Sequence, residues 1–258
     1  MSNDWDPTQY ARFANERSQP FFDLAALIER PAGPRLVDLG CGSGELTAWL
    51  VDSLQVSDAV GIDNSPAMLD VSAPHAGPAL RFAEADISAW TSAGDIDVVF
   101  ANASLQWVPD HIGLLGRWAA ALAPGGQLAV QVPANADHPA HLIIDAMRHE
   151  APYESYVIPP DPVADNVLPP EEYAGLLHSL GFARQHVRLQ VYGHLMADAA
   201  AVVEWVKGTT LTRVRRALPA HEYERFLVDY TARLADALDH RAPYFYPFKR
   251  ILFWGRRH

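Results

Sequence analysis

A glycine-rich run near the start of the chain has the residue types of a ligand-binding loop. Val37-Asp-Leu-Gly-Cys-Gly-Ser-Gly44 follows an apolar stretch that predicts a buried strand and precedes one that predicts a helix. Its three glycines let the backbone turn sharply and approach a ligand without an intervening side chain. Backbone N–H groups at the start of the helix then face an anionic group. The spacing is Gly-x-Gly-x-Gly, which disfavours the Gly-x-Gly-x-x-Gly loop of a dinucleotide oxidoreductase.

Polar residues follow the next two predicted strands. Asp63 ends the strand at 59–62, where a carboxylate can accept hydrogen bonds from both hydroxyls of a ribose. Asp86 and Ile87 end the strand at 80–85, where a polar group can meet an adenine amine while the apolar neighbour packs on the ring. Taken alone, Asp63 is also explained as a helix N-cap. Signals at three consecutive strand ends are stronger than any one of them.

Strand-like and helix-like patterns alternate along the chain around these motifs. The alternation predicts an α/β fold, a doubly wound parallel sheet with helices on both faces. In such a sheet the ligand lies outside the carboxyl ends of the strands, near the switch point. The predicted strands are residues 35–39, 59–62, 80–85, 96–100, 127–132, 187–192 and 251–254.

Two segments interrupt this rhythm, and we interpret both as covers over the site. Residues 1–33 carry aromatic side chains ahead of the first predicted helix, which favours a lid over a disordered tail. The proline clusters within 133–180 indicate an excursion across the site, with a plain surface loop as the alternative. We expect one domain over 1–258, divided into 1–33 (lid and first helix), 34–133 (core), 134–246 (insertion, cap and substrate-side elements) and 247–258 (terminal strand).

The composition restricts the class of protein. The chain has 258 residues, of which 49% are hydrophobic and 20% charged, as in an ordinary globular domain. The net charge of −11 argues against duplex nucleic acid or an anionic membrane surface as the main partner. No apolar run approaches the roughly 20 residues of a membrane span. The single cysteine, Cys41, fits a reducing compartment, so we expect a cytoplasmic protein with a small-molecule partner.

These motifs resemble those of the class I S-adenosylmethionine (SAM)-dependent methyltransferases. The glycine loop, Gly-Ile-Asp63 and Glu-Ala-Asp-Ile87 occur in the order and at the spacing of that family. The chain is further similar to the bacterial trans-aconitate methyltransferases, densely over residues 4–133 and more thinly afterwards. The proline-rich stretch 151–170 departs from their pattern. The finer similarity lies in Asp4-Trp-Asp-Pro7 with Tyr10, Phe13 and Glu16-Arg-Ser18, and in residues 62–68, 100–111 and 128–133.

The resemblance implies a seven-stranded, mostly parallel sheet with an antiparallel terminal strand, and SAM as the cofactor. The glycine loop would line the methionine moiety, Asp63 would hold the ribose and Asp86 would meet adenine. Asn102 would lie below the sulfonium at the end of the fourth strand. The implied cofactor residues are Asp38, Gly40, Cys41, Gly42, Ser43, Asp63, Asn64, Met68, Asp86, Ile87, Asn102, Ala103 and Leu105.

The implied reaction forms the methyl monoester of trans-aconitate or of a similar small polycarboxylate. A carboxylate nucleophile is already ionised at neutral pH, so we assign no general base. Arg250 is the first candidate to hold the substrate, because its position matches an arginine in the family and its planar fork pairs bidentately with carboxylates. Residues 181–258 contain 13 of the 20 Lys and Arg residues, a cationic region in an acidic protein. The implied substrate residues are Tyr10, Arg17, Trp107, Arg213, Tyr246 and Arg250.

Several alternatives stay open at this stage. Trp107 can instead be a core anchor, and Arg250 an ordinary surface cation. The chain can be a SAM-dependent O-methyltransferase of another small molecule, or a non-catalytic SAM-binding protein. His138 and His141 have the spacing of metal ligands on a helix, but no Cys or carboxylate set accompanies them in the sequence, so we expect no metal.

Overall fold

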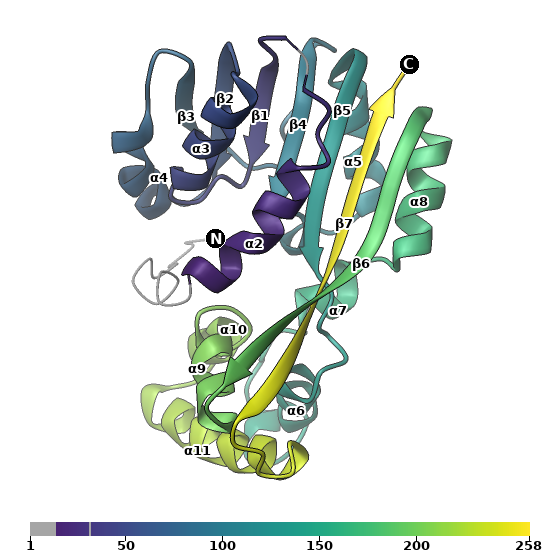
Figure 1. The fold of residues 1–258 in the computed structure, drawn as a ribbon. Helices are drawn as coiled ribbons and strands as arrows, with labels where there is room; N and C mark the ends of the chain where they lie inside the picture. The colour runs from purple at the N-terminus through teal and green to yellow at the C-terminus, as the bar shows by residue number, and fades with distance from the viewer. Residues whose placement is uncertain (1–13, 31) are drawn as a thin grey trace.

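A seven-stranded sheet forms the centre of the molecule. The computed structural model describes residues 14–30 and 32–258, with side chains from residue 18 onward. The strand order is β3-β2-β1-β4-β5-β7-β6, with β1 to β5 parallel and β7 antiparallel to both of its neighbours. This confirms the predicted fold class (Figure 1). The strands are β1 (Arg35–Leu39), β2 (Asp58–Asp63), β3 (Leu80–Glu84), β4 (Ile96–Asn102), β5 (Leu122–Pro133), β6 (Phe182–Met196) and β7 (Tyr244–Arg257).

Helices cover both faces of the sheet. On one face α2 (Ala14–Ala25) and α3 (Glu45–Leu54) pack against the even-numbered side chains of β4, such as Phe100. On the other face α5 (His111–Ala120) and α8 (Pro170–Ser179) pack against the odd-numbered ones, such as Val99. Because both faces are covered, residues 98–101 of β4 are a continuous apolar run rather than an alternating pattern. Short helices follow two strand ends: α4 (Pro66–Ser72) and then η1 (Ala73–His75) after β2, and η2 (Leu105–Trp107) after β4.

A helical cap lies beyond the carboxyl ends of the parallel strands (Figure 1). The strands β6 and β7 extend beyond the sheet as a two-stranded ribbon, in which β6 ends and β7 begins among the cap helices. A third hydrophobic core lies there, with Trp205, Phe226 and Tyr246 among its buried side chains. The cap contains α6 (Pro139–Met147), η3 (Tyr153–Ser155), α7 (Pro162–Asn166), α9 (Ala199–Lys207), α10 (Thr212–Ala217) and α11 (Ala220–Ala237).

The stretch 134–246, expected as one insertion, is divided between the sheet and this cap. Helix α8 packs on the sheet beside α5, and the first half of β6 is the outer strand of the sheet. Strand β6 extends beyond the predicted 187–192 at both ends, where polar residues such as Gln185 and His194 interrupt the apolar pattern on which the prediction rested. No helix within the described residues is both long enough and apolar enough to cross a membrane.

Candidate functional site

The glycine loop is fixed across the end of β2. The backbone N–H groups of Gly40 and Cys41 both donate to the carbonyl of Ile62, at 2.7 and 3.0 Å. Gly40 has φ +90°, and a Cβ there would lie 2.3 Å from Cβ of Ser104, so the close approach of these two loops requires glycine. A Cβ on Gly42 would meet nothing within 4 Å. The loop is therefore closed against the protein at Gly40 and open toward a ligand at Gly42.

Asp63 lies beside the open part of this loop. Its Oδ2 accepts from the N–H of Gly42 and its Oδ1 from the N–H of Ser65, each at 2.9 Å. Burial raises the pKa of this carboxyl, against the backbone hydrogen bonds that lower it. A carboxylate oxygen with one backbone donor still has a lone pair for another donor. The site can thus accept both hydroxyls of a ribose.

Asp38 and Cys41 have supporting roles in the loop. Asp38 is buried on β1 and accepts a hydrogen bond of 2.6 Å from Oγ1 of Thr47, which connects the strand to helix α3. Burial raises the pKa of Asp38 to about 7. Burial also raises the pKa of the Cys41 thiol, with further contributions from both nearby aspartates, and this disfavours the thiolate that a nucleophilic cysteine needs.

The predicted adenine-side residues surround the ends of β2 and β3. The N–H of Ala85 donates to the carbonyl of Asp63, which brings the loop after β3 next to β2. Asp86 is exposed and accepts from the N–H of Ser88 at 2.8 Å, and Ile87 packs at the edge of the sheet core. Of the others predicted here, Ser43 is half-buried, Asn64 is exposed and Met68 is buried.

A strained backbone position follows β4. Ala103 has φ +55°, a conformation that costs energy for any residue other than glycine. It is held there because its N–H donates to Gln131 O at 2.9 Å and its carbonyl accepts from Nε2 of Gln106 at 2.7 Å. Strain of this kind is common at ligand sites. Leu105 is fully buried in the core on the α5 side, whereas Trp107 is 41% exposed and is no core anchor.

The structure adds Gln131, on β5, to the predicted set. Gln131 pairs with Asn102 of β4 on one side and with Leu252 of β7 on the other. Arg250 lies two residues before Leu252 on β7. All three share the face of Phe100, Ala129 and Leu252, which α2 covers. Only one signal for Gln131 was available in the sequence, a polar residue inside the apolar run 128–132.

Arg250 lies at the junction between sheet and cap, and it is no ordinary surface cation. It is 8% exposed, and its guanidinium carbon lies 4.3 Å from the centre of the Phe248 ring. Residues before it on β7 belong to the cap core and residues after it to the sheet core. Tyr192 of β6 is near enough for the charge of Arg250 to influence its hydroxyl, and donates to Oδ2 of Asp23 at 2.7 Å.

The other predicted substrate residues have different positions. Tyr246 is fully buried in the cap core. Arg213, on α10, donates to the carbonyl of Pro159, and its Nε and Nη2 are buried without a hydrogen-bond partner among the described residues. Its neighbours on the same helix, Arg215 and Arg216, are exposed. Tyr10 lies outside the described residues, as does the side chain of Arg17.

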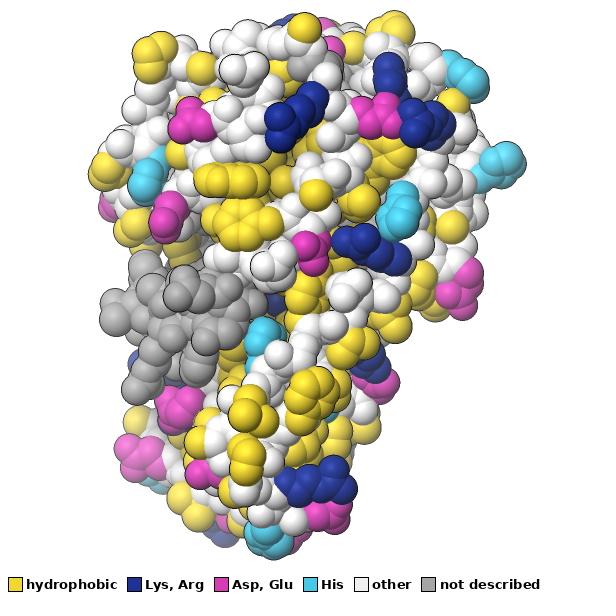
Figure 2. Space-filling model, viewed as in Figure 1, with side chains coloured by type: hydrophobic (Ala, Val, Ile, Leu, Met, Phe, Trp, Pro, Cys, Tyr) yellow, Lys and Arg dark blue, Asp and Glu magenta, His cyan; other side chains and the backbone are white. Residues whose placement is uncertain are grey.

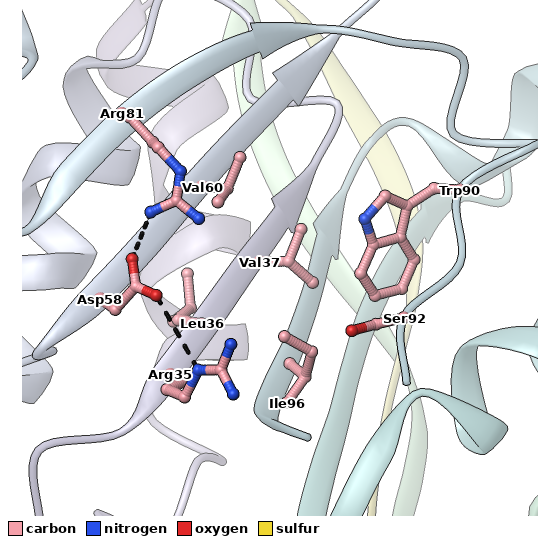
Figure 3. A pocket seen from close by; sticks show the side chains of 9 residues that line it. All are labelled: Arg35, Leu36, Val37, Asp58, Val60, Arg81, Trp90, Ser92 and Ile96. Carbon is pink, nitrogen blue, oxygen red and sulfur yellow. Dashed lines mark hydrogen bonds and ion pairs between the residues drawn. The ribbon is translucent and has the colours of Figure 1, made fainter. Parts of the chain in front are cut away.

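Two cavities lie away from the glycine loop. One of about 160 Å³ is at the amino ends of the strands, between Val37, Val60 and Trp90, with Arg35 and Arg81 both paired to Asp58 at its rim (Figure 3). Asp63 lies at the other end of the strands, at the carboxyl end of β2. The second, of about 130 Å³, is in the cap between α6 and α7.

The two candidate metal-ligating histidines have separate partners. Nε2 of His138 lies 2.9 Å from the hydroxyl of Tyr244, and burial lowers the pKa of His138 to about 4. Nδ1 of His141 lies 2.7 Å from Oδ2 of Asp161.

On the face seen in Figure 2, Lys and Arg side chains are interspersed with Asp and Glu among the coloured residues.

Known proteins resemble both the sequence and the fold. A family model described as "Methyltransferase domain" matches residues 10–187. Proteins named trans-aconitate 2-methyltransferase are similar along nearly their whole length: that of Variovorax paradoxus is 42% identical, covering 91% of this chain and 90% of the relative. That of Deinococcus radiodurans is 39% identical, covering 98% of both.

Solved structures of lower identity share the fold. The YcgJ protein of Bacillus subtilis has a TM-score of 0.61 at 15% identity, over 92% of this chain and 97% of that one. A Haemonchus contortus phosphoethanolamine N-methyltransferase, solved with SAM, has a TM-score of 0.56 at 17% identity, over 93% of this chain and 52% of that one. By the family model and by relatives of about 40% identity over more than nine-tenths of its length, this chain belongs to the methyltransferase family that includes the bacterial trans-aconitate 2-methyltransferases.

Proposed function

We propose that this protein is a SAM-dependent carboxyl methyltransferase that forms the monomethyl ester of trans-aconitate or of a similar small polycarboxylate. The observation that carries the proposal is Arg250. Its guanidinium is buried where the carboxyl ends of the sheet meet the cap, on the same face as Asn102 at the end of β4. A buried arginine at that place suits a substrate that carries carboxylates.

The residues at the ends of β1 and β2 fit SAM. Gly42 leaves space where a side chain would stand, and the Asp63 carboxylate beside it can accept two ribose hydroxyls. The half-buried Ile87 and the buried Met68 provide apolar surface for an adenine ring. When bound, SAM supplies an electrophilic methyl group on a sulfonium cation.

The protein's own groups then align the acceptor and exclude water. Arg250 holds a carboxylate that is not methylated. Arg213 of the cap, whose Nε and Nη2 have no hydrogen-bond partner within the described part of the chain, is a second candidate. The accepting carboxylate is directed toward Asn102 and Ala103. It is ionised at neutral pH, so no residue has to remove a proton. Methyl transfer neutralises charge, and a dry site between sheet, α2 and cap favours it.

Substitution of Arg250 tests the proposal. The parent should form a methyl ester when SAM carrying a labelled methyl group is supplied with trans-aconitate. We expect Arg250→Ala to lower kcat/KM for the acid by the equivalent of roughly 2–4 kcal/mol, and Arg250→Lys to lower it as well, because a point charge replaces a bidentate fork. SAM affinity, measured by calorimetry, should be nearly unchanged.

The exposed Arg233 of the cap, paired with Glu150, provides the matched control. Arg233→Ala should keep the parent's kcat/KM. A parent that binds SAM but methylates no di- or tricarboxylate would refute the proposed activity. An Arg250→Ala variant as active as the parent would show that the substrate pocket lies elsewhere in the protein.

A further inference from the structure

Two glutamines on strand β5 differ in a way that points to a ligand. Gln127 and Gln131 lie on the same face of the strand and are 2% and 1% exposed. Both polar atoms of Gln127 are hydrogen-bonded: its Nε2 donates to the carbonyl of Glu29, and its Oε1 accepts from the N–H of Glu29 and from Nε1 of Trp254. Neither polar atom of Gln131 has a hydrogen-bond partner among the described residues.

An amide buried without partners lowers stability, so its presence requires an explanation. The neighbouring positions on this face of β4, β5 and β7 are apolar except for Asn102 and Arg250. Oδ1 of Asn102 is also buried without a partner within the described part of the chain. Gln131 thus belongs to a short row of polar side chains at the carboxyl end of the sheet, rather than to the core.

The row has the dimensions of a small polyanion. Asn102, Gln131 and Arg250 come from three adjacent strands, β4, β5 and β7. Adjacent strands are about 4.8 Å apart, so the row covers about 10 Å. The amide NH₂ of Gln131 carries two donors, which complement carboxylate oxygens without a second buried positive charge beside Arg250.

We infer that Gln131 binds a carboxylate of the substrate between Asn102 and Arg250, and thereby selects which carboxylate faces the methyl group. This inference rests on the proposed function. The substrate enters between the carboxyl end of the sheet and α2, and the amide is satisfied only in the complex. Gln131 is therefore a specificity residue that lowers the stability of the free protein.

The test compares Gln131→Met with Gln127→Met. Methionine keeps the length of the side chain and removes both polar atoms. Gln131→Met should be at least as stable as the parent in urea, because no hydrogen bond within the described structure is lost. Its KM for trans-aconitate should rise roughly tenfold or more, with SAM affinity unchanged. Gln127→Met should show the reverse, a lower stability with an unchanged KM.

Two further variants make the outcome specific. Gln131→Glu should raise KM more than Gln131→Met, because a carboxylate repels the substrate, and Gln131→Asn should restore part of the affinity. The position of the ester in the product, determined by NMR, should become mixed in Gln131→Met. An unchanged KM and a single unchanged product in that variant would overturn the inference while the proposed function stands. A parent that esterifies no polycarboxylate would overturn both.

Discussion

At the scale of single residues, Asp63 is the most direct link between sequence and cofactor. Its carboxylate is half-buried and is held by the N–H groups of Gly42 and Ser65. We expect Asp63→Ala to weaken SAM binding by about 2–3 kcal/mol, because a charged acceptor is removed from a largely dry site. Calorimetric titration with SAM measures this loss. Asp58→Ala, on the exposed ion pair at the other end of β2, is the control and should bind SAM as the parent does.

Asp38 should make stability depend on pH. Its pKa is raised from 3.8 to about 7 in the folded protein, so between these values the folded state holds a proton that the unfolded chain has lost. The free energy of unfolding therefore falls as the pH rises through this range. The side chain of Asp38→Asn cannot titrate. Between about pH 4 and about pH 8, the free energy of unfolding of the parent should therefore fall by about 2–4 kcal/mol more than that of Asp38→Asn.

Urea denaturation of both proteins at several pH values measures this difference. The comparison has to be made against the parent, because His138, with its lowered pKa, changes stability in the opposite direction below about pH 6.5. Equal pH slopes for parent and Asp38→Asn would show that Asp38 is ionised throughout.

Single residues also show what sequence reasoning can reach. The glycine loop and Asp63 were predictable because their chemistry depends on spacing along one short segment. Gln131 was not, because what marks it is that both of its polar atoms are buried without a hydrogen-bond partner among the described residues. That depends on packing by β4, β7 and α2, which are distant in sequence. The exposure of Trp107 was likewise set by packing that no local pattern records.

At the scale of elements, the contact between α2 and β6 positions the first helix over the site. The hydroxyl of Tyr192 donates to Oδ2 of Asp23, and Oδ1 of Asp23 accepts from Nε2 of Gln19. We expect Tyr192→Phe to lower the free energy of unfolding by about 1 kcal/mol and to raise KM for the acid several-fold, since α2 loses its attachment near Arg250.

Urea denaturation and steady-state kinetics measure the two effects of Tyr192→Phe. Gln19→Ala removes the exposed half of the same network and should change the free energy of unfolding by less than about 0.5 kcal/mol. If Tyr192→Phe altered stability without altering KM, the contact would be structural only.

The strands at 35–39, 59–62, 80–85 and 96–100 were predictable to within two residues because each contains a short, mainly apolar stretch. In β4 the stretch 98–101 is continuous because both of its faces are covered. The cap was not, because 134–246 contains elements of two cores. Helix α8 precedes β6 and packs on the sheet, whereas α9 follows β6 and packs in the cap. Which core a helix joins depends on the path of the ribbon formed by β6 and β7.

At the scale of the whole molecule, the sheet and the cap are joined at Asn135. This side chain is fully buried after β5, accepts from the N–H of Lys249 and donates to the carbonyl of Pro247 at 3.5 Å. Asn135→Ala would leave the part-buried N–H of Lys249 without this acceptor. We expect the free energy of unfolding to fall by about 1–3 kcal/mol.

Asn166→Ala is the matched comparison for this junction. Its Nδ2 donates to the carbonyl of Gln106 at 3.0 Å from a half-buried position on α7, so its removal should cost only about 0.5–1.5 kcal/mol. Urea denaturation measures both variants. Equal losses would mean that burial at the junction adds nothing to the strength of the contact.

The continuous ribbon of β6 and β7 has a mechanical consequence. Its pairing runs from Phe182 opposite Arg257 to Met196 opposite Tyr244 without a break at Gln190 and Arg250. We expect a cap attached through such a ribbon to move by bending and twisting of the strands rather than by rotation about a flexible loop, with a restoring torque from the bent ribbon. Arg250 lies on this ribbon, so we expect a displacement of the cap to change the direction of its guanidinium and thus to couple the proposed substrate binding to cap closure. Amide hydrogens at this point should accordingly exchange slowly even while the cap moves.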